Sequence, residues 1–236
     1  MAARDWVSFW NSKHSVYVNA RHLDAHYRRI ADDLRTIVPA GGAMLDYGCG
    51  EALSHDLIAA MMERLILCDA APNVRAALRA RFAGNAKVEV SEPEHVAALS
   101  AGSLDVIVMH SVAQYLTAAA LGEQLAAFRR LLKSDGLLVL GDIIPPNVSP
   151  LTDALALLRF GAQHGFVVAA VGGLARTAFS SYARLRSTLG LTHYDARTMI
   201  ATLAAAGFRA ERAAANIGHN PARMTFLAQP RPLSVT

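Results

Sequence analysis

The feature of this chain that most restricts its fold is the glycine-containing stretch at residues 44–53, MLDYGCGEAL. Residues 44–47 combine apolar side chains with one acid and predict a short strand, and the apolar spacing of residues 53–62 predicts a helix. Gly48 and Gly50 lie between these elements, where glycine permits backbone angles closed to other residues and lets a ligand lie against the main chain. A strand, a glycine loop and a helix in this order predict an open α/β sheet whose ligand binds beyond the carboxyl ends of the strands.

The spacing of the glycines indicates which ligand the loop binds. A dinucleotide-binding loop needs glycine or alanine at its sixth position, where this chain has Leu53. The pattern fits G-x-G-x-G instead, with Ala52 in place of the third glycine. Together with the acid at its start, the segment 46–52, DYGCGEA, resembles the first motif of the class I S-adenosylmethionine (SAM) methyltransferases. The resemblance implies that SAM is the cofactor and that its site includes Asp46, Gly48, Cys49 and Gly50.

A second acid ends the next predicted strand, residues 65–69, at a distance that suits a bound ribose. Asp69 lies 21 positions after Gly48, and a carboxylate at about this spacing reaches ribose hydroxyls in nucleotide-binding α/β folds. In the resembled family this acid binds both ribose hydroxyls of SAM, which also implies a cofactor contact at the adjoining Ala70. An N-cap for the helix that begins near Pro72 is the alternative role, and one residue can serve both.

Two further segments resemble parts of the family that contact SAM. After the predicted strand 87–90, the resemblance implies a polar residue against the adenine amino group, and Glu92 stands there, although a solvent-exposed loop acid has the same pattern. The predicted strand 104–109 and the residues that follow it, DVIVMHSVAQYL, resemble the family's fourth motif. This implies that Met109 and His110 lie beside the methionine part of SAM and the transferred methyl group.

His110 is also the first candidate for a catalytic base. Methyl transfer from SAM mainly requires that the acceptor atom be placed against the activated methyl group. A base is needed only when the acceptor is an acidic hydroxyl, a thiol or a protonated amine, and histidine titrates in the right range. An ordinary hydrogen-bonded histidine at the end of a strand fits His110 equally well.

The order of the remaining elements predicts the architecture. A predicted turn at residues 133–136 and a fifth strand at 137–142 end the core, and the segments 208–215 and 224–228 predict a closing hairpin. We therefore expect a Rossmann-like, doubly wound, mostly parallel seven-stranded sheet with an antiparallel last strand. One domain over residues 1–236 suits this length. Its expected parts are a helical cap (1–40), a SAM-binding core (43–142), an insertion between strands five and six (146–190) and a closing helix and hairpin (195–229).

Aromatic and histidine residues outside the core predict where the methyl acceptor binds. The candidates for substrate binding are Tyr17, His22, His26, Tyr115 and His219. Aromatic residues ahead of the glycine loop are typical of a hydrophobic core, but they also suit a lid over the cofactor. His22 and His26 stand four apart on a predicted helix, yet no nearby carboxylate or cysteine completes a ligand set, so no metal is expected.

The insertion predicts an apolar wall. Residues 151–160 predict a helix with one apolar face, and residues 165–173 form a hydrophobic segment. In small-molecule methyltransferases of this family the insertion walls the acceptor pocket, which implies a partly apolar acceptor. A peripheral contact with a membrane or a partner through residues 151–175, a second helical layer that buries its own face, and a homodimer all remain open.

Charge distribution and composition disfavour other classes of partner. The net charge is +4, but the arginines are scattered rather than clustered, so solvated helix faces explain them better than a nucleic-acid site. The start of the chain lacks the apolar core of a signal peptide. The apolar run 166–175 is too short for a bilayer, which takes about 20 residues. Cys49 and Cys68 fall on parallel core segments that suit free thiols, so we expect a cytoplasmic protein.

We therefore expect a SAM-dependent methyltransferase that acts on a small, partly apolar molecule. A non-catalytic SAM-binding or nucleoside-binding protein is the alternative, because it would keep the same loop and ribose acid. A dinucleotide oxidoreductase is opposed by Leu53. The sequence does not specify the acceptor or the atom that is methylated.

Overall fold

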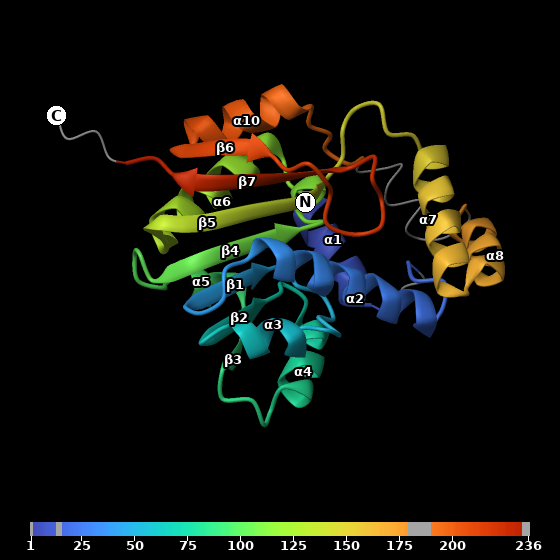
Figure 1. Ribbon diagram of the computed structural model, residues 1–236, viewed down its shortest axis with the longest axis horizontal. Coiled ribbons are helices and arrows are strands. Elements are labelled where there is room, and N and C mark those ends of the chain that lie inside the picture. The colour runs from blue at the N-terminus through green and yellow to red at the C-terminus, as the bar shows by residue number, and fades with distance from the viewer. Residues whose placement is uncertain (1, 13–15, 179–189, 233–236) are drawn as a thin grey trace.

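The strands form one sheet within the part of the chain that the computed structural model describes, residues 2–12, 16–178 and 190–232. The strands are β1 (Ala43–Tyr47), β2 (Arg64–Cys68), β3 (Val88–Ser91), β4 (Leu104–His110), β5 (Leu132–Ile143), β6 (Phe208–Arg212) and β7 (Met224–Pro230). Their order is β3-β2-β1-β4-β5-β7-β6 (Figure 1). The first five run parallel, and β7 pairs antiparallel with β5 and β6. The expected doubly wound sheet with an antiparallel last strand is confirmed.

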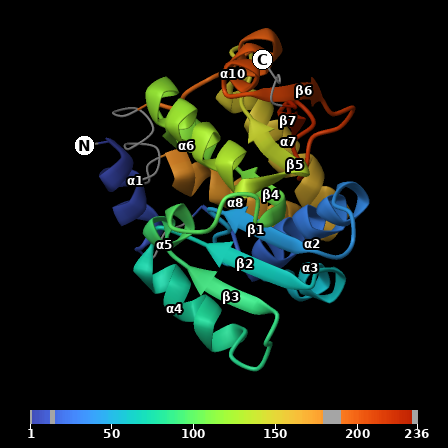
Figure 2. The same ribbon diagram turned by 90° about the vertical axis from the view of Figure 1, so that its left-hand side faces the viewer.

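Helices cover both faces of this sheet. They are α1 (Ala2–Trp10), α2 (Ala20–Ile37), α3 (Asp56–Met61), α4 (Pro72–Arg81), α5 (Pro93–Ala97), the 3-10 helix η1 (Ala113–Tyr115), α6 (Ala118–Leu131), α7 (Pro150–His164), α8 (Val167–Ala178) and α10 (Ala196–Ala205). Leu34 of α2 and Ile58 of α3 share one core cluster with Met44, whereas Phe128 of α6 shares the other with Leu45. Neighbouring strand residues thus point into opposite layers, and Figure 2 shows α2 and α3 across the sheet from α6.

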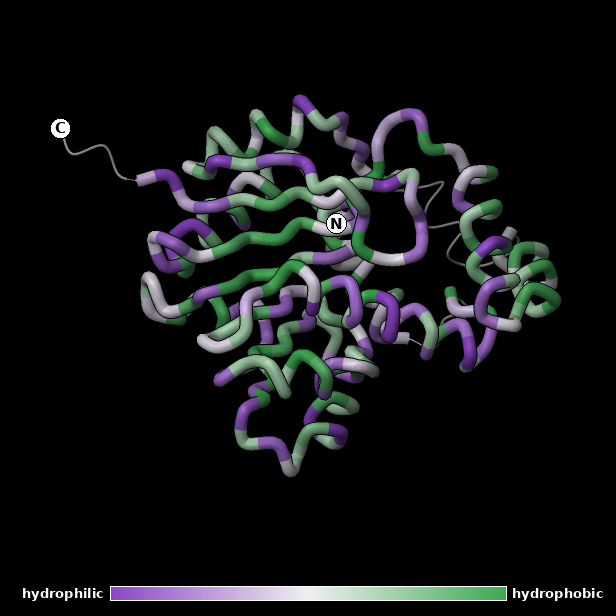
Figure 3. Tube along the Cα trace, in the orientation of Figure 1, coloured by the Kyte–Doolittle hydropathy of each residue, from purple (hydrophilic) through white to green (hydrophobic). Residues whose placement is uncertain are grey.

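The core lies where the strands are most apolar. Figure 3 shows hydrophobic residues running through β4 and β5 in the middle of the sheet, with hydrophilic residues concentrated in the connections. Strands that are covered on both faces read as continuous apolar runs rather than as alternating ones. No helix in the described ranges is long and apolar enough to cross a membrane.

Two predicted boundaries of the core differ from the structure. The helix after the glycine loop begins at Asp56 rather than residue 53, because the loop continues through Ala52, whose φ is +45°. The predicted turn at 133–136 is wrong as a separate element. Leu132 already pairs with Leu104, and the next pair is Val106 with Leu137, so these residues form a bulge inside β5.

The insertion forms a helical hairpin at the carboxyl end of the sheet. Helix α7 ends at Gly165, whose φ of +73° is the left-handed conformation that commonly terminates helices. The predicted hydrophobic segment continues from there into α8. Phe160 and Phe166 pack with Val18 and Ala25, so the hairpin and the N-terminal cap form one apolar cluster. Figure 1 shows this hairpin beyond the carboxyl ends of the parallel strands, beside one end of α2.

Candidate active site

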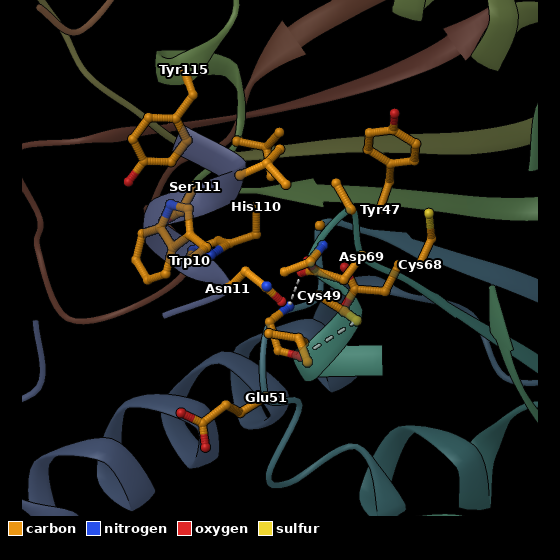
Figure 4. A pocket seen from close by; sticks show the side chains of 18 of the residues that line it. Trp10, Asn11, Tyr47, Cys49, Glu51, Cys68, Asp69, His110, Ser111 and Tyr115 are labelled. Atoms are coloured by element: carbon orange, nitrogen blue, oxygen red, sulfur yellow. Dashed lines mark hydrogen bonds between the residues drawn. The ribbon is translucent and has the colours of Figure 1, made fainter. Parts of the chain in front are cut away.

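A cavity of about 550 Å³ lies at the carboxyl ends of β1, β2 and β4. This volume is within the ordinary range of small-molecule sites. Ten of the residues predicted for the site line it: Tyr17, His26, Asp46, Gly48, Cys49, Gly50, Asp69, Ala70, His110 and Tyr115. Figure 4 shows Cys49 and Asp69 close together, with Trp10 and Tyr115 on another side of the cavity.

The glycine loop has the backbone conformation that the sequence motif requires. Gly48 and Gly50 have φ values of +78° and +57°, where a side chain is disfavoured. A Cβ at Gly48 would overlap the side chain of Val112, and one at Gly50 would overlap the Tyr27 hydroxyl. Ala52 also adopts a positive φ, +45°, at the position of the motif's third glycine. The loop therefore keeps the glycine-like path with alanine in that place.

Tyr27 connects the N-terminal cap to this loop. Its hydroxyl accepts a hydrogen bond from the Glu51 backbone N–H at 2.8 Å, and the Tyr17 hydroxyl lies 3.5 Å from the same oxygen. Burial raises the pKa of the Tyr27 hydroxyl well above its ordinary value, so it stays protonated. The sequence does not reveal this contact, because helical spacing does not show where a hydroxyl points.

Asp69 is held against the glycine loop by its backbone. One carboxylate oxygen accepts from the Gly50 N–H at 3.0 Å, and the other accepts from the Ala71 N–H at 2.8 Å. Burial raises the pKa of Asp69, and these two N–H groups oppose that effect. Each carboxylate oxygen has a second lone pair. Asp69 can therefore fix the loop and the start of α4 and still accept bonds from a ligand.

The cavity also contains a buried acid and histidine pair. His55 Nε2 lies 2.6 Å from Asp46 Oδ2, and the two residues are 1% and 4% exposed. Both line the cavity. No motif in the sequence links these two residues, and only the fold shows that the His55 ring lies against Asp46. This pair fixes the strand end from which the glycine loop begins.

Two of the predicted cofactor residues lie elsewhere. Glu92 is at the N-cap of α5 and forms an ion pair with Arg75, with 2.8 Å between Oε2 and Nη2. Met109 is 1% exposed and belongs to the core cluster on the α6 side of the sheet. Neither is among the residues that line the cavity.

His110 lies at the end of β4 and lines the cavity. Its Nε2 lies 3.2 Å from the carbonyl oxygen of Ile217, in the connection between β6 and β7. The next residue, Ser111, has a φ of +58°, and its hydroxyl donates to Asp142 at 2.5 Å. Asp142 also has a positive φ, +63°. Backbone conformations of this kind in residues other than glycine are costly and collect at functional sites.

A polar network that the sequence did not predict surrounds Asp142. Arg223 donates to Asp142 at 2.6 Å and to both carboxylate oxygens of Asp153 at 3.1 and 3.2 Å. Asn220 donates to Asp153 at 2.8 Å. Burial acts to raise the pKa of Asp142, but the Arg223 guanidinium and other hydrogen-bonding partners hold it below its ordinary value. The sequence signal for this network was the density of polar residues in the connection between β6 and β7.

Three histidines form a neutral cluster beside the cavity. The ring centroids of His22, His26 and His219 lie 5.9 to 6.2 Å apart. Burial lowers the pKa of His22 to about 4, and it lowers the pKa of His26 and His219 as well. His26 lines the cavity, whereas His22 stacks on Phe166 and His219 on Phe160 behind it. The described residues contain no group of ligands that could hold a metal ion.

Aromatic residues of α1 close one side of the cavity. The ring of Trp6 lies 4.5 Å from that of Tyr115, and Trp10 lies 6.1 Å from Tyr115. Trp6 is 3% exposed, so it has a core role as well as a cavity-lining one. The core interpretation therefore holds for Trp6, and a lid over the cofactor stays a prediction.

Comparison with known proteins agrees with this geometry. Residues 45–140 match the family model described as a methyltransferase domain. No curated protein matches the chain by sequence. The match to the family model spans the glycine loop, Asp69 and His110, so the expected methyltransferase domain is confirmed over these residues.

Similar solved structures share the fold at low sequence identity. Phosphoethanolamine N-methyltransferase 1 of Haemonchus contortus has a TM-score of 0.66 at 14% identity over 100% of this chain and 50% of its own. The N-methyltransferase NodS of Bradyrhizobium japonicum, bound to S-adenosylhomocysteine (SAH), has a TM-score of 0.60 at 15% identity. The match covers 99% of this chain and 100% of NodS. The structure of a DhpI–SAH complex has a TM-score of 0.64 at 12% identity, and the match covers 98% of each chain.

Proposed function

We propose that this enzyme transfers the methyl group of SAM to a small, partly apolar molecule. The observation that carries the proposal is one continuous cavity that joins the glycine loop and Asp69 to His110 and Tyr115. Bound SAM supplies a methyl group activated by its sulfonium. The acceptor atom bonds to that methyl group as the methyl–sulfur bond breaks, so the chain must hold two molecules in line.

For the cofactor, we propose that the main chain at Gly48 to Gly50 lies against SAM and that Asp69 binds its ribose. The positive φ values of both glycines and the close approach of Tyr27 and Val112 support this. Asp46 and His55 brace the strand end behind the loop. Cys49 and Ala70 line the same part of the cavity.

For the acceptor, we propose a site between the cap and the end of β4. Tyr17, His26 and Tyr115 line this part of the cavity, and His22 and His219 support it from behind. The histidines carry no charge near neutral pH, because burial lowers the pKa of each. Aromatic walls with neutral ring nitrogens suit an acceptor that has an apolar body and an uncharged polar group. His110 is the group that would accept a proton from it.

Calorimetry and a methylation assay test this proposal. The chain is titrated with SAM, SAH and NAD, and we expect the first two to bind. It is then incubated with SAM and a panel of phenols, amines and carboxylates, with SAH formation as the readout. Binding of NAD without SAM would refute the cofactor assignment, and SAM binding with no SAH formed from any acceptor would favour a non-catalytic role.

We also propose a peripheral contact with an anionic lipid surface through the α7–α8 hairpin. Its exposed apolar side chains are Leu151 (68%), Leu155 (47%), Val167 (40%), Val168 (84%) and Val171 (58%). The exposed charged residues of positions 150–176 are Arg159 and Arg176, while Asp153 turns inward to Arg223. Apolar side chains with basic neighbours suit anionic lipid, whereas a homodimer through this face would oppose like charges. Flotation with anionic vesicles and sedimentation without them distinguish the two.

Two further expectations are part of the proposal. We propose no nucleic-acid partner, because Arg28, Arg29 and Arg64 form ion pairs with acids of the same surface. We propose a cytoplasmic location, because Cys49 and Cys68 are buried free thiols that suit a reducing compartment.

A further inference from the structure

The hydrogen bond of His110 fixes which of its ring nitrogens can act as a base. A carbonyl oxygen can only accept, so the contact with Ile217 requires that Nε2 carry the proton. In the neutral ring the lone pair then lies on Nδ1. The Cδ2 atom of the ring faces Gly141, where a Cβ would lie 2.6 Å away, and Nε2 faces Gly218. Nδ1 lies on the opposite edge of the ring from Cδ2, and His110 lines the cavity.

The carbonyl of Ile217 is held in place from behind. The Ile217 N–H donates to the Thr225 hydroxyl at 2.9 Å, and that hydroxyl donates to Asn216 Oδ1 at 3.0 Å. Thr225 is fully buried. The Gly218 N–H donates to Asp33 of α2 at 2.9 Å. The backbone on both sides of the carbonyl therefore has a fixed partner.

Asp142 connects this loop to the strand end that carries His110. It accepts from Ser111, which follows His110, and from Arg223, and its own N–H donates to Asn216 Oδ1 at 3.2 Å. Ser111 and Asp142 both hold a positive φ, and their side chains bond to each other across β4 and β5. The residue that follows His110 and the loop that contacts its ring are thus joined through Asp142.

We infer that Asp142 and Thr225 are positioning residues that hold His110 in the tautomer with a proton on Nε2 and with Nδ1 directed at the acceptor. The part played by His110 rests on the proposed function, but the tautomer does not. When the acceptor loses a proton as it gains the methyl group, that proton passes to Nδ1 and the ring becomes an imidazolium. A ring with its proton on Nδ1 would have no lone pair on the cavity side.

Nitrogen-15 NMR of histidine-labelled protein tests this inference without an acceptor. Long-range proton–nitrogen correlations distinguish the two neutral tautomers, and the variant His110→Gln assigns the signal. We expect the wild-type chain to show the Nε2–H form. In Asp142→Asn and in Thr225→Val we expect the ratio of tautomers to move at least about fivefold toward Nδ1–H. Thr225→Val removes the acceptor of the Ile217 N–H, and Asp142→Asn weakens the bonds to Ser111 and Arg223 that hold the strand end carrying His110.

Thr202→Val is the matched control. It also removes a threonine hydroxyl bond, here to the Thr198 carbonyl of α10, away from the cavity, and we expect the wild-type ratio. A wild-type spectrum with the Nδ1–H form would overturn the inference, whether or not the variants fold. So would an unchanged ratio in either folded variant. Titration of the same sample with SAH reports separately on the proposed function, because a chain that binds no SAH can still show the predicted tautomer.

Discussion

The neutral histidine cluster makes the stability of the fold depend on pH. Burial lowers the pKa of His22 from 6.5 to about 4. In the unfolded chain the same ring takes up a proton below about pH 6.5. The unfolded state therefore binds more protons than the folded state between these values, and stability falls as the pH falls through this window. Above pH 6.5 both states are neutral at this site and the stabilisation is complete.

The size of the effect follows from the same pKa values. Lowering a pKa from 6.5 to about 4 corresponds to about 3 kcal/mol of proton-binding free energy. Part of this is screened where solvent reaches the ring, so we expect about 2 kcal/mol from His22. His26 and His219 add to the slope in the same direction, since burial lowers the pKa of each.

Urea unfolding of the wild type and of His22→Asn between pH 7.5 and 4 measures the contribution of His22. Asparagine keeps an acceptor for the Val18 N–H, which bonds to His22 Nδ1 at 3.3 Å. We expect the variant to be less stable at pH 7.5, because it loses the stacking on Phe166, and to lose about 2 kcal/mol less than the wild type on acidification. His193→Asn, at an exposed position, is the control. If the free energy of unfolding fell by the same amount in the wild type and in His22→Asn between pH 7.5 and 4, the reasoning would be refuted.

Three substitutions test the cofactor half of the site. Asp69→Ala should weaken SAM binding by about 1 to 3 kcal/mol in calorimetry. Glu63→Ala, at an exposed position, is the control and should bind SAM as the wild type does. Equal SAM affinities for Asp69→Ala and the wild type would contradict the ribose contact. Tyr27→Phe should weaken SAM binding by about 1 kcal/mol, because the Glu51 N–H loses its acceptor. Tyr194→Phe should have no effect, because the Tyr194 hydroxyl makes no hydrogen bond within the described residues. His55→Leu should lower the free energy of unfolding by about 3 kcal/mol, since Asp46 is left buried without its partner, and an unchanged midpoint in urea would exclude that role.

Much of the fold could be predicted because local patterns carry it. The glycines at 48 and 50, the acids that end β1 and β2, and the apolar runs of the strands each specify a local conformation that the sheet then combines. The bulge at 133–136 could not be predicted from its own residues. They suit a turn, and only the pairing of Leu132 with Leu104 shows that they interrupt a strand.

The candidate site likewise contains contacts that the sequence predicts and contacts that only the fold reveals. Gly50 and Asp69 belong to a spaced motif, so the sequence alone brings them together, and in the structure their backbone and side chain bond at 3.0 Å. Asp142 and Arg223 stand 81 positions apart, and no short pattern links them. The direction in which His55 points depends on the path of the loop through Ala52. Contacts of this kind are decided by tertiary structure.

A crystal structure of the chain with SAH tests the central claim most directly. The account predicts SAH against the main chain of residues 48–50, its ribose hydroxyls within hydrogen-bonding distance of the Asp69 carboxylate and its sulfur on the side of the cavity where His110 lies. Density for SAH in another place, or a Leu53 side chain in the space that the cofactor needs, would contradict it.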